Sequence, residues 1–146
     1  MSYPDPEPGL VISYSYLWSD EAAAGHVEGR KHRPCAIVLA VAPDPRVHEG
    51  RRVAVLPITH APPSDAGGAV ELPRAVRKHL GLDDAPSWVI VDELNEFVWP
   101  GFDLRHVPGK PGQYAYGFLP PRFFDGLRAR LRERRTQRQL NAVTRD

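Results

Sequence analysis

Short apolar runs separated by proline and glycine constrain this chain more than any other feature. The 146 residues include 16 Pro and 12 Gly, and both residue types end helices and mark turns. Strands of about 4–8 residues fit between such turns, whereas long helices do not. No apolar run approaches the ~18 residues that span a bilayer. The sequence therefore predicts a mainly β domain with no membrane segment.

Alternating or continuous apolar residues predict short strands along most of the chain. The expected strands cover residues 10–17, 34–41, 52–59, 70–72, 87–92, 97–99 and 116–119. Pro57 has no N–H to donate to a strand ladder. The strand that contains it is therefore expected to lie at an edge of the sheet or to be broken there.

Helical signals are fewer. A single turn is expected over 20–24, and a short helix over 73–80 has Pro73 at its first position and Gly81 just past its end. A longer helix begins at Pro121, with apolar residues at helical spacing. Together these elements predict a small, strongly curved β-barrel with a short inserted helix and a C-terminal helix.

The cysteine content indicates a cellular compartment. Cys35 is the single cysteine, so no disulfide forms within the chain, and zinc sites built from cysteines are excluded. The first ten residues carry acidic residues and prolines, where a secretory signal would carry Lys or Arg before an apolar stretch. The sequence predicts a cytoplasmic protein and indicates no cofactor.

Positive charge is concentrated at the C-terminal end. The formal net charge is +1, but residues 128–146 hold seven Arg against two acidic residues, so the rest of the chain carries −4. Affinity for nucleic acid would have to come from a local patch or from this end. We expect a flexible segment over 1–8, a barrel domain over 9–133, and an Arg-rich tail over 134–146 that is disordered or a frayed helix.

Two clusters of polar residues suit chemistry on a phosphodiester. One cluster precedes the strand over 34–41, and the other ends the strand over 52–59. The candidate residues are Glu28, Arg30, Lys31, His32, Arg33, Thr59 and His60. Loops at the strand ends of a barrel gather around one mouth, so we expect both clusters to face one site.

Each of these residue types has a use in cleaving RNA. The planar fork of Arg33 can hold two phosphate oxygens, and Thr59 can donate to a nonbridging oxygen. Glu28 or His60 can move a proton, and the other three basic residues of the loop are expected to bind the substrate. The simplest reaction for this set is metal-free attack by an RNA 2′-hydroxyl on its own phosphate.

Structural roles stay open for the same residues. A charged loop before a core strand is usually solvated, and a threonine at a strand end usually bonds the backbone. A histidine in the position of His60 is usually an exposed turn residue. Trp88 and Trp99 are expected in the core rather than as platforms for bases.

Two motifs resemble the MazF/PemK family of toxin–antitoxin ribonucleases. These are the Arg33-Pro34 pair that leads an apolar strand, and the strand over 55–59, Val-Leu-Pro-Ile-Thr. The resemblance covers residues 9–133 and implies an SH3-like barrel that forms a homodimer and cleaves single-stranded RNA to a 2′,3′-cyclic phosphate. It also implies that Arg33 and Thr59 are the principal catalytic residues, with Glu28 assisting, and that an acidic antitoxin covers the RNA groove.

Two other functions stay open. The first is a catalytically inactive SH3-like module that binds a peptide or a nucleic acid, since a fold does not determine a function. The second is a DNA-directed regulator that uses the Arg-rich end of the chain, for which binding should fall steeply with salt.

Overall fold

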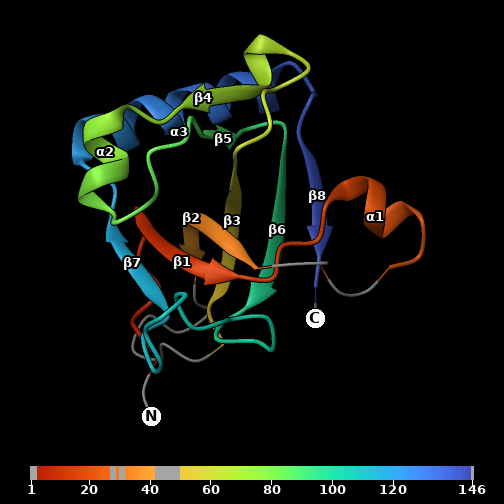
Figure 1. Cartoon of the computed structure of the whole chain (residues 1–146). Helices are drawn as coiled ribbons and strands as arrows, with labels where there is room; N and C mark the ends of the chain where they lie inside the picture. Colours follow the sequence, from red (N-terminus) through yellow and green to blue (C-terminus); the bar gives the residue numbers. More distant parts are fainter. Residues whose placement is uncertain (1–2, 27–28, 30–31, 42–49, 146) are drawn as a thin grey trace.

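The computed structural model describes residues 3–26, 29, 32–41 and 50–145. Within these residues the chain forms a mainly β structure with an eight-stranded sheet (Figure 1), which confirms the predicted fold class. The strands are β1 (Leu10–Tyr14), β2 (Arg33–Val41), β3 (Arg52–Thr59), β4 (Ala69–Glu71), β5 (Trp88–Ile90), β6 (Glu93–Val98), β7 (Ala115–Phe118) and β8 (Asn141–Thr144). The helices are α1 (Ser19–Ala23), α2 (Arg74–His79) and α3 (Pro121–Thr136), with a short 3₁₀ turn, η1, at Ala66–Gly68.

Strand β3 is the centre of the sheet. It pairs antiparallel with β2 along one edge, and with β6 and then β5 along the other. The sheet runs in the order β4-β5-β3-β2-β1-β7, and β8 adds to β6 in parallel. This sheet is consistent with a curved, barrel-like fold. The SH3-like barrel implied by the resemblance stays a prediction.

Pro57 lies where the second edge of β3 changes its partner. β6 pairs with β3 as far as Val55, and β5 begins to pair at Ile58. Because Pro57 has no N–H, it fits in this gap between the two partner strands. On the other edge it faces Cys35 of β2. The expected break in the strand therefore holds for one edge of β3 only.

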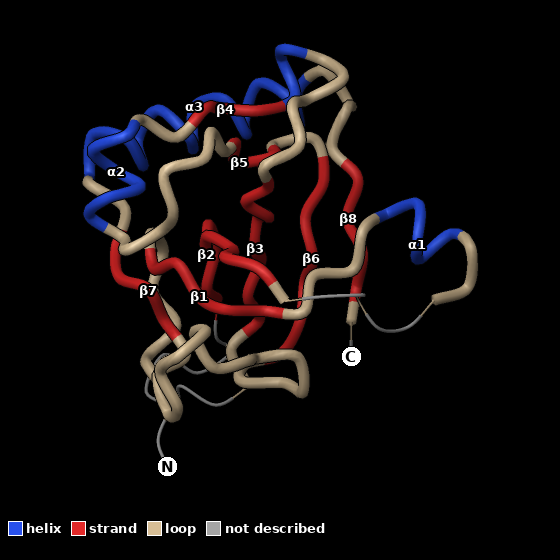
Figure 2. The backbone as a smooth tube through the Cα atoms, in the orientation of Figure 1, coloured by secondary structure: helices blue, strands red, loops and turns tan. Residues whose placement is uncertain are grey.

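Successive residues of β2 and β3 contribute to two hydrophobic cores, because neighbouring side chains in a strand point to opposite faces. One core is covered by α2 and α3, which contribute Val76 and Leu127. The other is rich in aromatic residues, including Tyr14 and Phe97, whose ring centroids are 4.8 Å apart. Figure 2 shows α2 and α3 close together, and α1 at the opposite side of the molecule.

The sequence signals for the helices are confirmed. α2 follows Pro73, and Gly81 turns the chain with φ +71 just after the helix, a conformation that glycine adopts at little cost. Pro121 is the first residue of α3, where its missing N–H has no helical partner to lose. Among the described residues, no helix has both the length and the apolar character that a membrane crossing requires.

The described part of the Arg-rich segment differs from the expected tail. α3 extends to Thr136, the chain turns at Arg138 with φ 58, and β8 then pairs with β6. Arg134 is 7% exposed, and its Nη2 donates to Asp65 Oδ2 at 2.7 Å. The charge run suggested a tail that is disordered or a frayed helix. A carboxylate distant in the sequence instead holds Arg134 against the domain.

Arg145 attaches the end of β8 to the aromatic core. Its side chain is 5% exposed and donates to Tyr14 Oη at 3.3 Å, to Asp103 Oδ1 at 3.0 Å and to the Ser15 carbonyl. The described residues of this segment are thus part of the folded domain.

The described part of the N-terminal segment, residues 3–8, has no helix or strand. It nevertheless contacts the domain, since Pro6 is buried and the Tyr3 ring centroid lies 4.8 Å from that of Tyr114.

Candidate functional site

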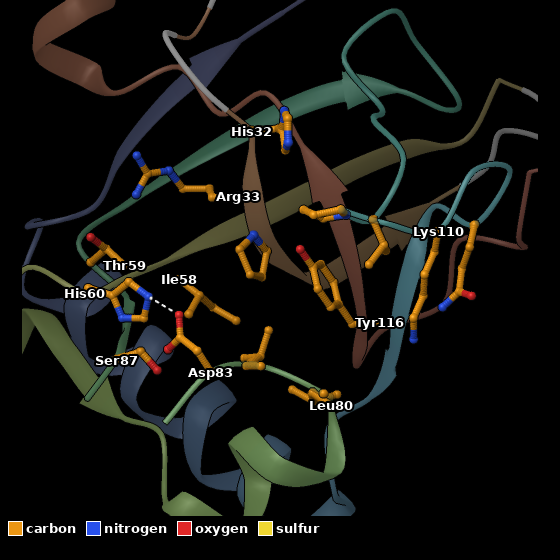
Figure 3. Close-up of a pocket in the computed structure, with 16 residues that line it drawn as sticks. His32, Arg33, Ile58, Thr59, His60, Leu80, Asp83, Ser87, Lys110 and Tyr116 are labelled. Atoms are coloured by element: carbon orange, nitrogen blue, oxygen red, sulfur yellow. Dashed lines mark hydrogen bonds and ion pairs between the residues drawn. The ribbon is translucent and has the colours of Figure 1, made fainter. Parts of the chain in front are cut away.

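A cavity of about 460 Å³ lies where β2 begins and β3 ends (Figure 3). Four of the candidate residues line it, namely His32, Arg33, Thr59 and His60. The expectation that the two polar clusters face one site therefore holds for these residues. Glu28, Arg30 and Lys31 lie outside the described residues.

The pairing of β2 with β3 explains why Arg33 and Thr59 meet. The antiparallel register sets Cys35 opposite Pro57. This is the last pair of the ladder at this end, and Arg33 and Thr59 each lie two residues beyond it along their own strands. The start of β2 and the end of β3 thus lie at the same end of the strand pair, and both residues line the cavity.

Arg33 has no charged partner among the described residues. It is half-buried, and its Cζ lies 5.0 Å from the centroid of the Trp18 ring. Its Nε is buried without a hydrogen-bond partner, and none of the ion pairs between described residues includes Arg33. A guanidinium in this state retains its donors for an anionic ligand.

Arg33 also lines a second cavity, of about 630 Å³, together with Tyr16, Trp18, Ser19 and Glu93. Glu93 accepts hydrogen bonds from Tyr16 Oη at 3.1 Å and from the Ser19 amide at 2.9 Å. Burial nevertheless raises the pKa of the Glu93 carboxyl above its usual value. Arg33 therefore stands at the boundary between two hollows of the surface.

The Thr59 hydroxyl has a defined orientation. Its Oγ1 accepts a hydrogen bond from the Ala61 amide at 3.1 Å. A threonine at a strand end was expected to bond the backbone in this way. Because this bond uses an oxygen lone pair, the hydroxyl proton stays available to a ligand. The structural role and a role in binding are therefore compatible.

His60 is exposed but held at both ring nitrogens. Nδ1 lies 3.0 Å from the Pro86 carbonyl oxygen, and Nε2 lies 3.1 Å from Asp83 Oδ2. Both oxygens can only accept, so a ring nitrogen that forms one of these bonds donates its proton to the oxygen. Both ring nitrogens of His60 therefore have partners within the protein.

Sequence reasoning missed several residues of the cavity. Asp83, Ser87, Lys110, Gln113 and Tyr116 all line it, and Figure 3 shows four of them labelled, with the His60–Asp83 bond dashed. Burial raises the pKa of Tyr116, so its phenol is a neutral donor near pH 7. No motif links these positions, because they come from loops and strands that only the fold brings together.

The arginine and hydroxyl donors that line this cavity could bind an anion. Among the described residues, no group of three or more His, Cys, Asp or Glu side chains could hold a metal ion. No protein-family model, curated protein or solved structure matches this chain. The function is therefore inferred from the geometry and from the two sequence motifs.

Proposed function

We propose that this protein is a metal-independent endoribonuclease that cleaves single-stranded RNA to a 2′,3′-cyclic phosphate. One observation carries the proposal: the unpaired guanidinium of Arg33 and the oriented hydroxyl of Thr59 line the same cavity. These are also the two residues that the resemblance to the MazF/PemK family assigns to catalysis.

In the proposed reaction, the 2′-oxygen of a ribose attacks the adjacent phosphorus. The new 2′-O–P bond closes a cyclic phosphate, and the bond from phosphorus to the 5′-oxygen of the next nucleotide breaks. Arg33 holds two phosphate oxygens and offsets the negative charge that develops on them. Thr59 donates to a nonbridging oxygen and orients the phosphate.

Two proton transfers complete the proposed reaction. One group removes the 2′-hydroxyl proton, and a second delivers a proton to the departing 5′-oxygen. His60 is the proposed donor because it lines the same cavity as Thr59. Glu28 is the proposed base, on the strength of its position in the sequence. His32, with Arg30 and Lys31, is proposed to bind flanking phosphates.

The resemblance extends the proposal to partners. The proposal therefore includes a homodimer, an acidic antitoxin that covers the site, and a cytoplasmic location. An acidic segment would compete with RNA for the Arg33 guanidinium, since a carboxylate and a phosphate use the same donors.

The test is cleavage of a defined single-stranded RNA in the presence of EDTA, with analysis of the product ends. Arg33→Ala should lower the rate at least ~10²-fold, the loss expected when one stabiliser of the transition state is removed. The matched control is Arg128→Ala, because Arg128 is an exposed arginine that stacks on Phe124 in α3.

Cyclic phosphate ends from wild type and Arg128→Ala, with little product from Arg33→Ala, would support the proposal. Equal cleavage by all three proteins would refute the role of Arg33. Binding of RNA or a peptide without turnover would favour the alternative, an inactive SH3-like binding module.

A further inference from the structure

The Ser87 hydroxyl is buried in the wall of the Arg33 cavity without a hydrogen-bond partner. Ser87 is 2% exposed, and no described residue bonds its Oγ. Nearly all buried polar groups in proteins are bonded, and an unbonded one lowers stability. Ser87 also lines the cavity, so a ligand there could supply the missing partner.

The fold holds Ser87 in this position. Its carbonyl accepts a hydrogen bond from the Leu72 amide at 2.9 Å, and β5 begins at the next residue. In β5, Trp88 pairs with Thr59 of β3, and the carbonyl oxygen of Pro86, the residue before Ser87, lies 3.0 Å from His60 Nδ1. The hydroxyl is therefore close to the proposed catalytic residues and is rigidly placed.

The surroundings of Ser87 suit an uncharged flat ring. Ile58, Leu80, Leu82 and Val107 contribute apolar side chains to the same cavity, while the unpaired guanidinium of Arg33 stands at its border with the second cavity. A phosphate prefers the cationic border, whereas a heterocycle prefers apolar walls with a few fixed polar groups. A nucleotide satisfies both preferences at once.

We infer that this cavity binds the base of a nucleotide adjacent to the cleaved phosphate, and that Ser87 reads an edge of that base through its hydroxyl. The inference rests on the proposed function for the identity of the phosphate at Arg33. Ser87 is then a specificity residue, and its unbonded hydroxyl in the free protein is a cost in stability that ligand binding removes.

The experiment measures binding separately from cleavage. Four single-stranded octamers of A, C, G or U, with 2′-fluoro sugars that cannot attack the phosphate, are titrated against wild type and Ser87→Ala by fluorescence anisotropy. The control is Ser64→Ala, which removes an exposed hydroxyl in a loop. Thermal unfolding of all three proteins is followed in parallel.

We expect wild type to prefer one or two of the four octamers. Ser87→Ala should weaken the preferred complex about tenfold, the equivalent of one hydrogen bond, and should leave the weakest complex unchanged. Its melting temperature should be equal to or above that of wild type, because the substitution removes an unbonded buried hydroxyl. Ser64→Ala should change neither quantity.

Three results would overturn the inference: no binding of any octamer by wild type, no preference among the four, or an equal loss for all four together with a lower melting temperature. The last result would show that Ser87 is structural. The separate cleavage assay distinguishes the two proposals. Base-selective binding without cleavage would refute the proposed nuclease activity and support the base pocket. Cleavage without base preference would support the nuclease activity and refute the base pocket.

Discussion

The guanidinium of Arg33 lies over the ring of Trp18, with Cζ 5.0 Å from the ring centroid. Arg33 begins β2, and Trp18 immediately precedes α1. The face of an aromatic ring attracts a guanidinium that lies over it. This contact forms no hydrogen bond, so it uses none of the N–H donors of Arg33. Trp18 thus holds Arg33 in place without occupying the groups that would bind a phosphate.

Trp18→Leu should lower kcat/KM for single-stranded RNA about 2- to 5-fold, the equivalent of one exposed cation–π contact. Trp18→Phe should retain most of the rate, since a ring face remains beneath Arg33. Steady-state cleavage kinetics of both variants test this. A rate for Trp18→Leu equal to that of wild type would show that the stacking has no part in positioning Arg33.

Thr59→Val should lower the cleavage rate about 10- to 10²-fold, because it removes one donor to the phosphate and keeps the branched shape of the side chain. Thr59→Ser retains the hydroxyl and the bond from the Ala61 amide, so it should stay within a few fold of wild type. Single-turnover cleavage separates the two variants. Equal rates for both would exclude a donor role for Thr59.

Arg145→Ala should destabilise the fold by about 3–5 kcal/mol, because it leaves the Asp103 carboxylate without its buried partner. Asp103 is only 17% exposed at its side chain, and Arg145 also holds Tyr14 and Ser15. Urea denaturation measures the loss. Arg132→Ala, an exposed position of α3, is the control and should change stability little. A similar loss in the free energy of unfolding for both variants would contradict the role of Arg145 as an anchor.

Because of the Asp65–Arg134 pair, the free energy of unfolding should depend on pH in the acid range. Hydrogen bonds from Arg134 and the Gly67 amide lower the pKa of Asp65. A carboxyl group whose pKa is lowered by folding stabilises the fold at pH values above its ordinary pKa of about 3.9. That stabilisation is lost as the pH falls through the lowered pKa. Asp65→Asn should therefore be less stable than wild type at pH 7, and the difference should shrink below about pH 4.

Denaturation curves of both proteins between neutral and strongly acid pH test this sign. A difference between wild type and Asp65→Asn that is constant across that range would show that the charge of Asp65 is not involved. The loss would then come from the shape of the side chain or from its bond to the Gly67 amide.

Local patterns predicted most of the elements. The apolar run after Pro34 became β2, the strand over 52–59 was correct at both ends, and Pro73 and Gly81 marked the limits of α2. These signals depend on residues near one another in the chain. β6 is longer than the predicted strand over 97–99, because it contains polar residues such as Asn95 that the fold buries.

The site was predictable only in part. Arg33 and Thr59 could be found because one begins and the other ends a strand with a clear pattern, and because adjacent strands bring their ends together. Asp83 and Ser87 could not, since a single acidic residue or serine in a loop carries no signal. Their importance comes from the register between β3 and β5 and from the bond between Asp83 and His60.

The sequence by itself determined most of the strands, the limits of α2, the start of α3 and the two motifs of the candidate site, because these depend on local backbone preferences and side-chain periodicity. Only the tertiary structure decided the fate of the Arg-rich segment. Arg134 meets Asp65 and Arg145 meets Asp103 across 69 and 42 residues of chain. A charge is solvated unless folding brings it an opposite charge, and pairs at such separations leave no local pattern in a sequence.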